Sequence, residues 1–202
     1  LRAVRELAAP GLEASRIGGK KMESNLKMRN SLSTFVGRLH GHEREGLLRS
    51  AATDSLQLRG ARLARLGLAH AEPVQVVRYA HEGVYWHHTD WMRVQATRSI
   101  RSGTVLCYLS DGFEGGETNF PMAGHAGAPL SSKSTASTCS SGLSVEGKLG
   151  DAILFYNINT THPHAEGAID RTTTHAGCPV TWGEKWVANV WLHNRDAYDS
   201  AA

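Results

Sequence analysis

The sequence predicts a mainly β domain, in which short strands form a sandwich or barrel behind an N-terminal helical layer. Helical spacing of apolar residues is confined to about residues 1–70. After Pro73, short runs rich in β-branched and aromatic residues follow one another, separated by Gly, Asn, Asp and Pro. A chain of 202 residues also has the size of one domain with a single core.

The N-terminal part carries the predicted helices. Residues 1–8 are expected to form the end of a helix, which a Pro-Gly pair stops. Residues 12–40 are expected to be mostly irregular. A second helical pattern runs from His42 to about Leu66, with Gly60 as a candidate break between two helices.

The remainder carries the predicted strands, which are expected at residues 74–79, 85–90, 101–109, 151–156, 173–181 and 185–193. The segment 122–147 is rich in Ser, Thr, Ala and Gly, which is typical of a long loop or lid. We expect this segment and residues 12–28 to become ordered when a ligand binds.

Composition excludes several classes of function. The net charge is +3 and no basic run is present, so nucleic acid is not an expected partner. No stretch approaches the roughly 20 apolar residues that cross a bilayer, so we expect no membrane contact by this segment. The chain begins with Leu1 rather than Met, and an upstream anchor or signal stays open. We expect the chain to act as a monomer.

The most informative motif is His88-Thr89-Asp90, because it has the spacing of two metal ligands on one strand. Residues i and i+2 of a strand point to the same face, so His88 and Asp90 can reach one ion while Thr89 faces away. His175, on a distant predicted strand, can complete a set of two imidazoles and one carboxylate. That set leaves coordination positions open and suits non-haem Fe(II) in oxygen-activating enzymes.

Four further motifs accompany this one. The first runs from Tyr108 to Asp111 and continues with Gly-Gly-Glu-Thr and Phe-Pro up to residue 121. The others are residues 148–155, the block from His175 to Trp191, and Arg29-Asn30-Ser31 upstream. With them, nearly the whole chain resembles the prolyl 4-hydroxylases of plant, algal and collagen type, in the 2-oxoglutarate/Fe(II) dioxygenase superfamily. The resemblance implies a double-stranded β-helix (jelly-roll) core at about residues 73–195, behind a helical layer at about residues 1–70.

The same resemblance implies a set of cofactors and the residues that bind them. His88, Asp90 and His175 would be the iron ligands. Lys185 would pair with the distal carboxylate of 2-oxoglutarate, since a buried unpaired lysine would be costly. Tyr79 and Thr118 would donate hydroxyl hydrogen bonds to 2-oxoglutarate. O2 would be the oxidant and L-ascorbate the reductant.

A second set of residues matches the peptide-binding positions of the family: Arg29, Ser31, Glu72, Tyr85, Arg101, Trp191 and His193. Tyr85 and Trp191 make sense as flat platforms for a polyproline II helix, whose free carbonyls arginines can bind. The alternative is that Tyr85 and Trp191 are core aromatics and that Arg101 is a solvated strand charge.

The other histidines and the cysteines are expected to lie outside the site. His87 should face away from His88, and His125, His162 and His164 are read as structural or solvated. Cys107 lies in an apolar run and is expected to be a buried free thiol. Cys139 and Cys178 could pair, which would tie a loop to the strand after His175, but spacing alone does not establish that geometry.

The predicted function is therefore hydroxylation of prolyl residues in a proline-rich peptide, coupled to decarboxylation of 2-oxoglutarate. Two alternatives stay open. One is a 2-oxoglutarate oxygenase that acts on another residue or a small metabolite, and the other is a non-catalytic module that binds proline-rich peptides. The resemblance also favours a location in the secretory pathway, in the lumen of the endoplasmic reticulum or Golgi.

Overall fold

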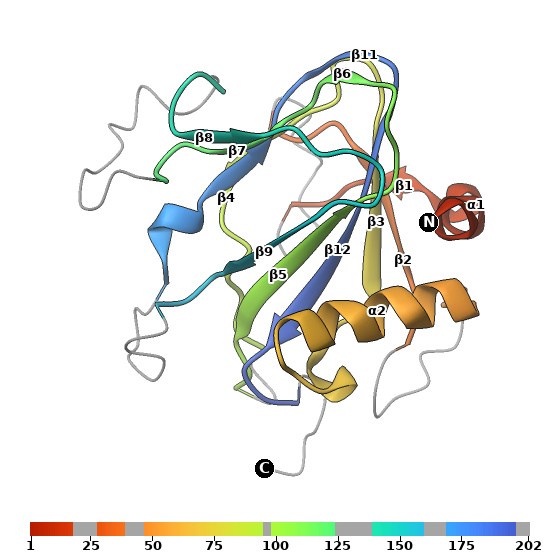
Figure 1. The fold of residues 1–202 in the computed structure, drawn as a ribbon, viewed down its shortest axis with the longest axis vertical. Helices are drawn as coiled ribbons and strands as arrows, with labels where there is room; N and C mark the ends of the chain where they lie inside the picture. Colours follow the sequence, from red (N-terminus) through yellow and green to blue (C-terminus); the bar gives the residue numbers. More distant parts are fainter. Residues whose placement is uncertain (18–27, 39–46, 95–97, 124–138, 160–168, 197–202) are drawn as a thin grey trace.

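The computed structural model describes residues 1–17, 28–38, 47–94, 98–123, 139–159 and 169–196 (Figure 1). Its α-helices are α1 (Arg2–Ala8) and α2 (Ala51–Leu63), and 3-10 turns occur at Ala9–Gly11, Leu68–His70 and Arg171–Thr173. In the described ranges, no helix is long and apolar enough to span a membrane.

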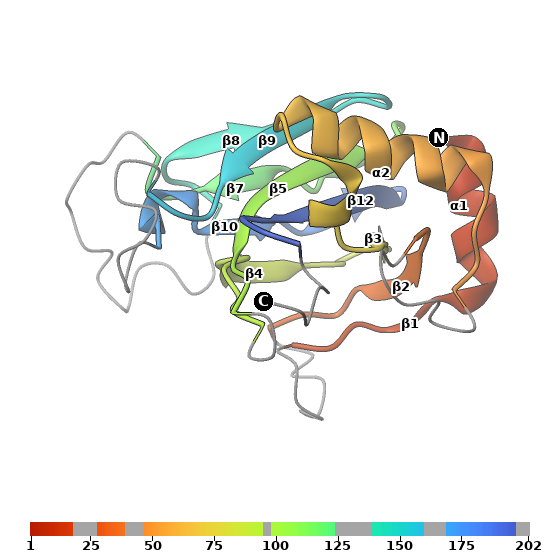
Figure 2. The same cartoon turned by 90° about the horizontal axis from the view of Figure 1, so that it is seen from below.

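The strands form two facing antiparallel sheets and a small pair. The major sheet has the order β1 (Glu13–Ala14), β2 (Leu32–Val36), β3 (Val74–Tyr79), β12 (Lys185–His193), β5 (Arg101–Tyr108) and β9 (Ala152–Tyr156). The minor sheet has the order β4 (Tyr85–His88), β10 (His175–Gly177), β7 (Thr118–Phe120) and β8 (Leu143–Val145). β6 (Glu114–Gly115) pairs with β11 (Val180–Trp182) at one end. Figure 2 shows α2 on the side of the major sheet that faces away from β4.

Strand β12 shows how the sheet separates core from site. Trp186, Ala188, Val190 and Leu192 belong to the core cluster that also contains helix residues such as Val4 and Ala61. The alternating residues Lys185, Val187, Asn189 and Trp191 instead line a cavity on the opposite face. The two-residue period of a strand therefore sends one set to the helices and the other to the site.

Helix α2 begins with a capping box, in which the Ser50 and Thr53 side chains each bond the other residue's backbone N–H. The expected break at Gly60 is wrong, because α2 continues through it. A Cβ at Gly60 would come within 3.0 Å of the Val190 side chain. Gly60 therefore lets the helix lie close to β12 rather than ending it.

Three strands lie where irregular structure was expected, and these expectations are wrong. β2 falls within residues 12–40, where it pairs with β3 along its whole length. β1 lies within the expected loop 12–28, and β8 within the expected loop 122–147. The strand expected at 173–181 is two strands, β10 and β11, separated at Pro179, which has no N–H to donate to a ladder. Residues 18–27 and 124–138 lie outside the described residues.

Candidate active site

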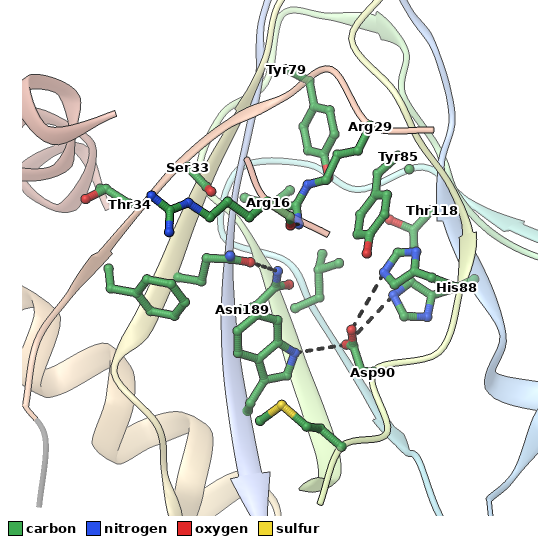
Figure 3. A pocket seen from close by; sticks show the side chains of 18 of the residues that line it. Arg16, Arg29, Ser33, Thr34, Tyr79, Tyr85, His88, Asp90, Thr118 and Asn189 are labelled. Atoms are coloured by element: carbon green, nitrogen blue, oxygen red, sulfur yellow. Dashed lines mark hydrogen bonds and ion pairs between the residues drawn. The ribbon is translucent and has the colours of Figure 1, made fainter. Parts of the chain in front are cut away.

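Two strands of the minor sheet bring the metal motif together. His88 ends β4 and is the register partner of His175 on β10, so the two imidazoles lie side by side with ring centroids 4.3 Å apart. Asp90 follows β4 directly. Its Oδ1 lies 3.6 Å from His88 Nε2, and its Oδ2 lies 3.8 Å from His175 Nε2 (Figure 3). The three ligand atoms all lie within 4.8 Å of one another.

Backbone carbonyls orient both imidazoles. His88 Nδ1 bonds the Trp86 carbonyl at 2.9 Å, and His175 Nδ1 bonds the Thr173 carbonyl at 3.0 Å. A carbonyl oxygen only accepts hydrogen bonds, so each Nδ1 carries the proton and each Nε2 keeps its lone pair. Both lone pairs are therefore free for an ion, and this support of metal-binding histidines is usual in proteins.

The carboxylate of Asp90 is held from the major sheet. Its Oδ2 accepts hydrogen bonds from the Thr104 hydroxyl on β5 at 2.8 Å and from the Trp191 indole on β12 at 3.0 Å. Burial by itself would raise the pKa of Asp90, but His175, His88 and Arg101 outweigh it and lower that pKa to about 2. Asp90 is therefore an anion at any physiological pH.

This arrangement fits a divalent iron ion. Burial, together with the neighbouring His175, lowers the pKa of His88 to about 3, so the imidazole is neutral and can act as a ligand. One carboxylate and two imidazoles on one side of an ion leave the opposite side open to other ligands.

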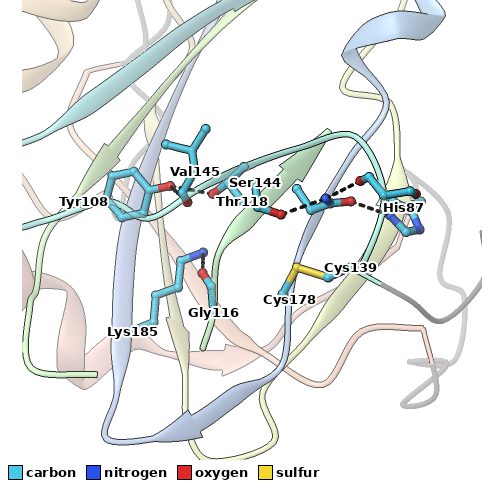
Figure 4. Close-up of a disulfide and its surroundings, with 11 residues drawn as sticks. His87, Tyr108, Gly116, Thr118, Cys139, Ser144, Val145, Cys178 and Lys185 are labelled. Carbon is cyan, nitrogen blue, oxygen red and sulfur yellow. Dashed lines mark hydrogen bonds between the residues drawn. A yellow bond between two sulfur atoms is a disulfide. The ribbon is translucent and has the colours of Figure 1, made fainter. Parts of the chain in front are cut away.

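Lys185, which begins β12, is a buried ammonium in the same cavity. It is 1% exposed, and its Nζ donates to the Gly116 carbonyl at 2.6 Å (Figure 4). Burial lowers its pKa to about 7. No described carboxylate forms an ion pair with it, so Lys185 is suited to an acidic ligand that enters the cavity.

Two tyrosine rings lie near Lys185. Its Nζ lies 5.4 Å from the centroid of the Tyr79 ring and 5.5 Å from that of Tyr108. The Tyr108 hydroxyl bonds the Thr118 hydroxyl at 2.7 Å. Burial raises the pKa of both tyrosines to about 12, so both remain neutral donors. Tyr108 was not among the expected site residues. It enters the site through its register on β5 opposite Val187, which only the structure shows.

The metal motif and Lys185 line one cavity of about 790 Å³. Tyr79 and Thr118 line it near Lys185, and Arg29, Tyr85, Arg101 and Trp191 line it near the metal motif. The cavity continues toward Arg16 and Phe35 at the β1–β2 edge. A site of this shape can hold a small acid next to a metal and still admit an extended ligand.

The expected peptide-binding residues separate into two groups. In the first, the Arg29 guanidinium lies 4.2 Å from the centroid of the Tyr85 ring, and Tyr85 stacks on His88 with centroids 3.6 Å apart. The Arg101 guanidinium lies 3.7 Å from the ring centroid of Trp191. These contacts bring cations and aromatic faces to the cavity wall beside the metal motif.

The second group supports those arginines from behind and does not line the cavity. Ser31 accepts from Arg29 Nε at 3.0 Å. Glu72 accepts two bonds from Arg101, at 2.7 and 3.0 Å, and bonds His193 at 2.8 Å. Burial would raise the pKa of Glu72, but Arg101 and His193 outweigh it and lower that pKa. The alternative of a solvated Arg101 is wrong, because its side chain is buried and paired.

His87 and the cysteines do not line this cavity. His87 bonds Asn119 at 3.2 Å and does not line the cavity, whereas His125, His162 and His164 lie outside the described residues. Cys139 and Cys178 form a disulfide with Cα atoms 6.1 Å apart (Figure 4). Cys107 is buried and free.

The chain belongs to the 2OG-Fe(II) oxygenase superfamily, whose family model matches residues 74–193. This class of protein accounts for the two facing sheets and for the position of the metal motif between them.

Within that superfamily, the chain is similar to prolyl 4-hydroxylases, as its motifs predicted. It is 32% identical over 200 residues to the probable prolyl 4-hydroxylase 9 of Arabidopsis thaliana, which covers 96% of this chain and 64% of that protein. It is 38% identical over 136 residues to prolyl 4-hydroxylase 2 of the same plant, which covers 64% of this chain and 44% of that protein. The chain thus spans less than two thirds of the length of these relatives.

Solved structures show the same fold. The viral collagen prolyl hydroxylase of Paramecium bursaria Chlorella virus 1, in its 2OG complex, has a TM-score of 0.55 and 25% identity, covering 84% of this chain and 81% of that chain. A Pseudomonas putida prolyl 4-hydroxylase has a TM-score of 0.56 at 16% identity, covering 95% of this chain and 82% of that chain. The expected jelly-roll core is thereby confirmed.

Proposed function

We propose that this chain is the catalytic domain of a prolyl 4-hydroxylase. One oxygen atom of O2 enters a prolyl ring as a hydroxyl, and the other enters succinate as 2-oxoglutarate loses CO2. The observation that carries the proposal is that the metal motif lines one cavity together with the buried Lys185, which forms no ion pair with a described carboxylate. A metal-binding set next to a lysine amine suits an acid that reaches both.

In this proposal His88, Asp90 and His175 hold Fe(II), which supplies the activation of O2. The carbonyls of Trp86 and Thr173 and the donors Thr104 and Trp191 keep the ligand atoms in position. The protein therefore contributes a preformed ligand geometry.

Lys185 would pair with the distal carboxylate of 2-oxoglutarate, and the hydroxyls of Tyr79 and Thr118 would donate to the same group. The Tyr108 hydroxyl bonds Thr118 and would hold it in place. The 2OG complex of the similar viral enzyme supports this cosubstrate.

A peptide substrate is supported by the length and lining of the cavity and by the named activity of the relatives. Tyr85 and Trp191 would bind prolyl rings, and Arg29 and Arg101 would donate to peptide carbonyls. Ser31, Glu72 and His193 would fix those arginines. A polyproline II segment suits such a groove because its carbonyls have no internal partners.

Three further properties complete the proposal. Residues 1–202 form one domain, which works as a monomer and uses L-ascorbate as reductant. It acts in an oxidising compartment, the lumen of the endoplasmic reticulum or Golgi. The disulfide between Cys139 and Cys178 supports such a compartment, since disulfides persist there and are rare in the cytosol.

The experiment is a mass-spectrometric assay with Fe(II), 2-oxoglutarate and ascorbate on polyproline, collagen-like and arabinogalactan-like peptides. We expect hydroxylated proline and succinate in equal amounts, with far lower turnover of free proline. Efficient hydroxylation of free proline, without gain from longer peptides, would overturn the peptide assignment. Peptide binding without any 2-oxoglutarate turnover would instead indicate a non-catalytic module.

A further inference from the structure

The cavity continues past Trp191 to an exposed aromatic side chain, Phe35, that no part of the reaction requires. We propose that Phe35 and Trp191 form a second ring-binding subsite, which selects a proline three residues from the one that is hydroxylated. This inference rests on the proposed function and adds a sequence preference to it.

Phe35 has the position and exposure of a ligand-binding residue rather than of a core residue. It lies on β2 near the edge of the major sheet, lines the cavity and is 40% exposed. It belongs to neither hydrophobic core cluster. Its ring centroid lies 6.2 Å from that of Trp191, with an angle of 47° between the planes. Rings at this separation contact each other, so the two form an aromatic wedge that a prolyl ring can pack against rather than enter.

The floor of this wedge is polar. Phe35 is the register partner of Gln75, and Gln75 is the register partner of Asn189, so the three side chains form one row on the inner face of the sheet. Asn189 Nδ2 donates to Gln75 Oε1 at 3.3 Å (Figure 3). Gln75 Nε2 makes no hydrogen bond to a described residue, which leaves it available to a peptide carbonyl. Aromatic walls with an amide donor between them suit a polyproline II segment.

The distance between the wedge and the metal motif indicates which residue of a bound peptide packs against the wedge. Trp191 joins the two places, since its indole donates to Asp90 at 3.0 Å while its ring lies 6.2 Å from Phe35. These two links limit the separation of the Phe35 ring from the Asp90 carboxylate to at most roughly 11 Å, a span of about three residues at the ~3.1 Å rise of polyproline II. That helix has three residues per turn, so residues three apart project from the same side. A ring three positions from the target proline would face Phe35.

The test uses a proline-rich peptide with one hydroxylatable proline and variants in which each flanking proline is replaced singly by alanine. The wild-type protein should prefer the peptide with a ring three residues away by about tenfold in kcat/KM, which is the effect expected of one aromatic contact. Phe35→Ala and Phe35→Leu should bring that ratio close to one, and Phe35→Tyr should keep it. Trp182→Ala is the matched control, because Trp182 is 62% exposed but does not line the cavity.

Equal losses on all peptides, or an unchanged preference in Phe35→Ala, would overturn the subsite. Direct titration of peptide binding separates this inference from the function on which it rests. If binding depended on the ring and on Phe35 but no peptide were hydroxylated, the proposed activity would fail and the subsite would stand. If peptides with and without the ring at this position were hydroxylated equally well, the proposed activity would stand and the subsite would fail.

Discussion

The indole of Trp191 donates a hydrogen bond to Asp90 at 3.0 Å, so one side chain both lines the cavity and supports the metal motif. The same Asp90 oxygen accepts from Thr104 at 2.8 Å, and Asn157 donates to Thr104 at 3.1 Å. Because Asn157 directs a proton at the Thr104 oxygen, the Thr104 hydroxyl proton points to Asp90. The residue proposed to bind a prolyl ring is therefore in direct contact with a proposed metal ligand.

This link predicts that Trp191→Phe weakens metal binding as well as peptide use. The phenyl ring keeps an aromatic face but removes a hydrogen bond to a charged group, and loss of such a supporting partner typically costs 10–100-fold in metal affinity. Titration with Co(II), followed by its absorption spectrum, measures the effect. Tyr85→Phe is the control, because it keeps a ring in the groove and has no bond to Asp90. An unchanged Co(II) affinity in Trp191→Phe would contradict the link.

Fe(II)-dependent turnover should be abolished in His88→Ala and in His175→Ala, since each change removes one ligand atom. His87→Ala is a matched control, because the neighbouring histidine bonds Asn119 and does not line the cavity. Zn(II) or Mn(II) should fill the site without supporting turnover. Metal content measures whether the site is filled, and succinate production measures turnover. Normal activity in both ligand variants would show that the ligands were wrongly assigned.

Lys185→Ala should raise the 2-oxoglutarate requirement by two orders of magnitude or more. Removing one partner of a buried charge pair costs about 3–5 kcal/mol, because the other charge is left uncompensated. The measurement is the concentration of 2-oxoglutarate at half-maximal succinate production. Lys185→Arg restores the charge but not the geometry and should recover only part of the loss. An unchanged titration in Lys185→Ala would remove Lys185 from the site.

The lowered pKa of Lys185, about 7, predicts two opposite pH dependences. Between pH 7 and the ordinary lysine pKa of 10.5, the unfolded chain holds more protons at this position, so the ligand-free protein gains stability as pH rises, by up to about 1.4 kcal/mol per pH unit. 2-Oxoglutarate favours the charged ammonium, so its affinity should fall over the same range.

Denaturant unfolding and calorimetric titration at several pH values measure these trends. Lys185→Met, which has a similar length and no charge, should lose both of them. If the variant kept the rise in stability, another group would be responsible.

Reduction of the disulfide should destabilise the protein. Cys139 and Cys178 are 39 positions apart, and closing a loop of that size contributes about 2–4 kcal/mol to the free energy of unfolding. Thiol counting in denatured, oxidised protein should find only Cys107 free. Three free thiols in that material would show that the pair does not form.

The local sequence pattern alone determined several strands and part of the metal motif. Strands β3 and β12 were predicted with their observed bounds, because β-branched and aromatic runs between turn residues leave little choice of structure. The spacing of His88 and Asp90 placed both on one face of the strand and its continuation, and the resemblance supplied His175 and Lys185.

Only the tertiary structure decided what each of these residues touches. β2 is too mixed in composition to be recognised, and pairing with β3 makes it a strand. Gly60 remains helical because β12 lies against it. Phe35, Tyr108 and Thr104 carry no signal of their own and enter the site through register with distant strands. Such contacts depend on which strands become neighbours, and that outcome follows from burial of the whole core rather than from any local pattern.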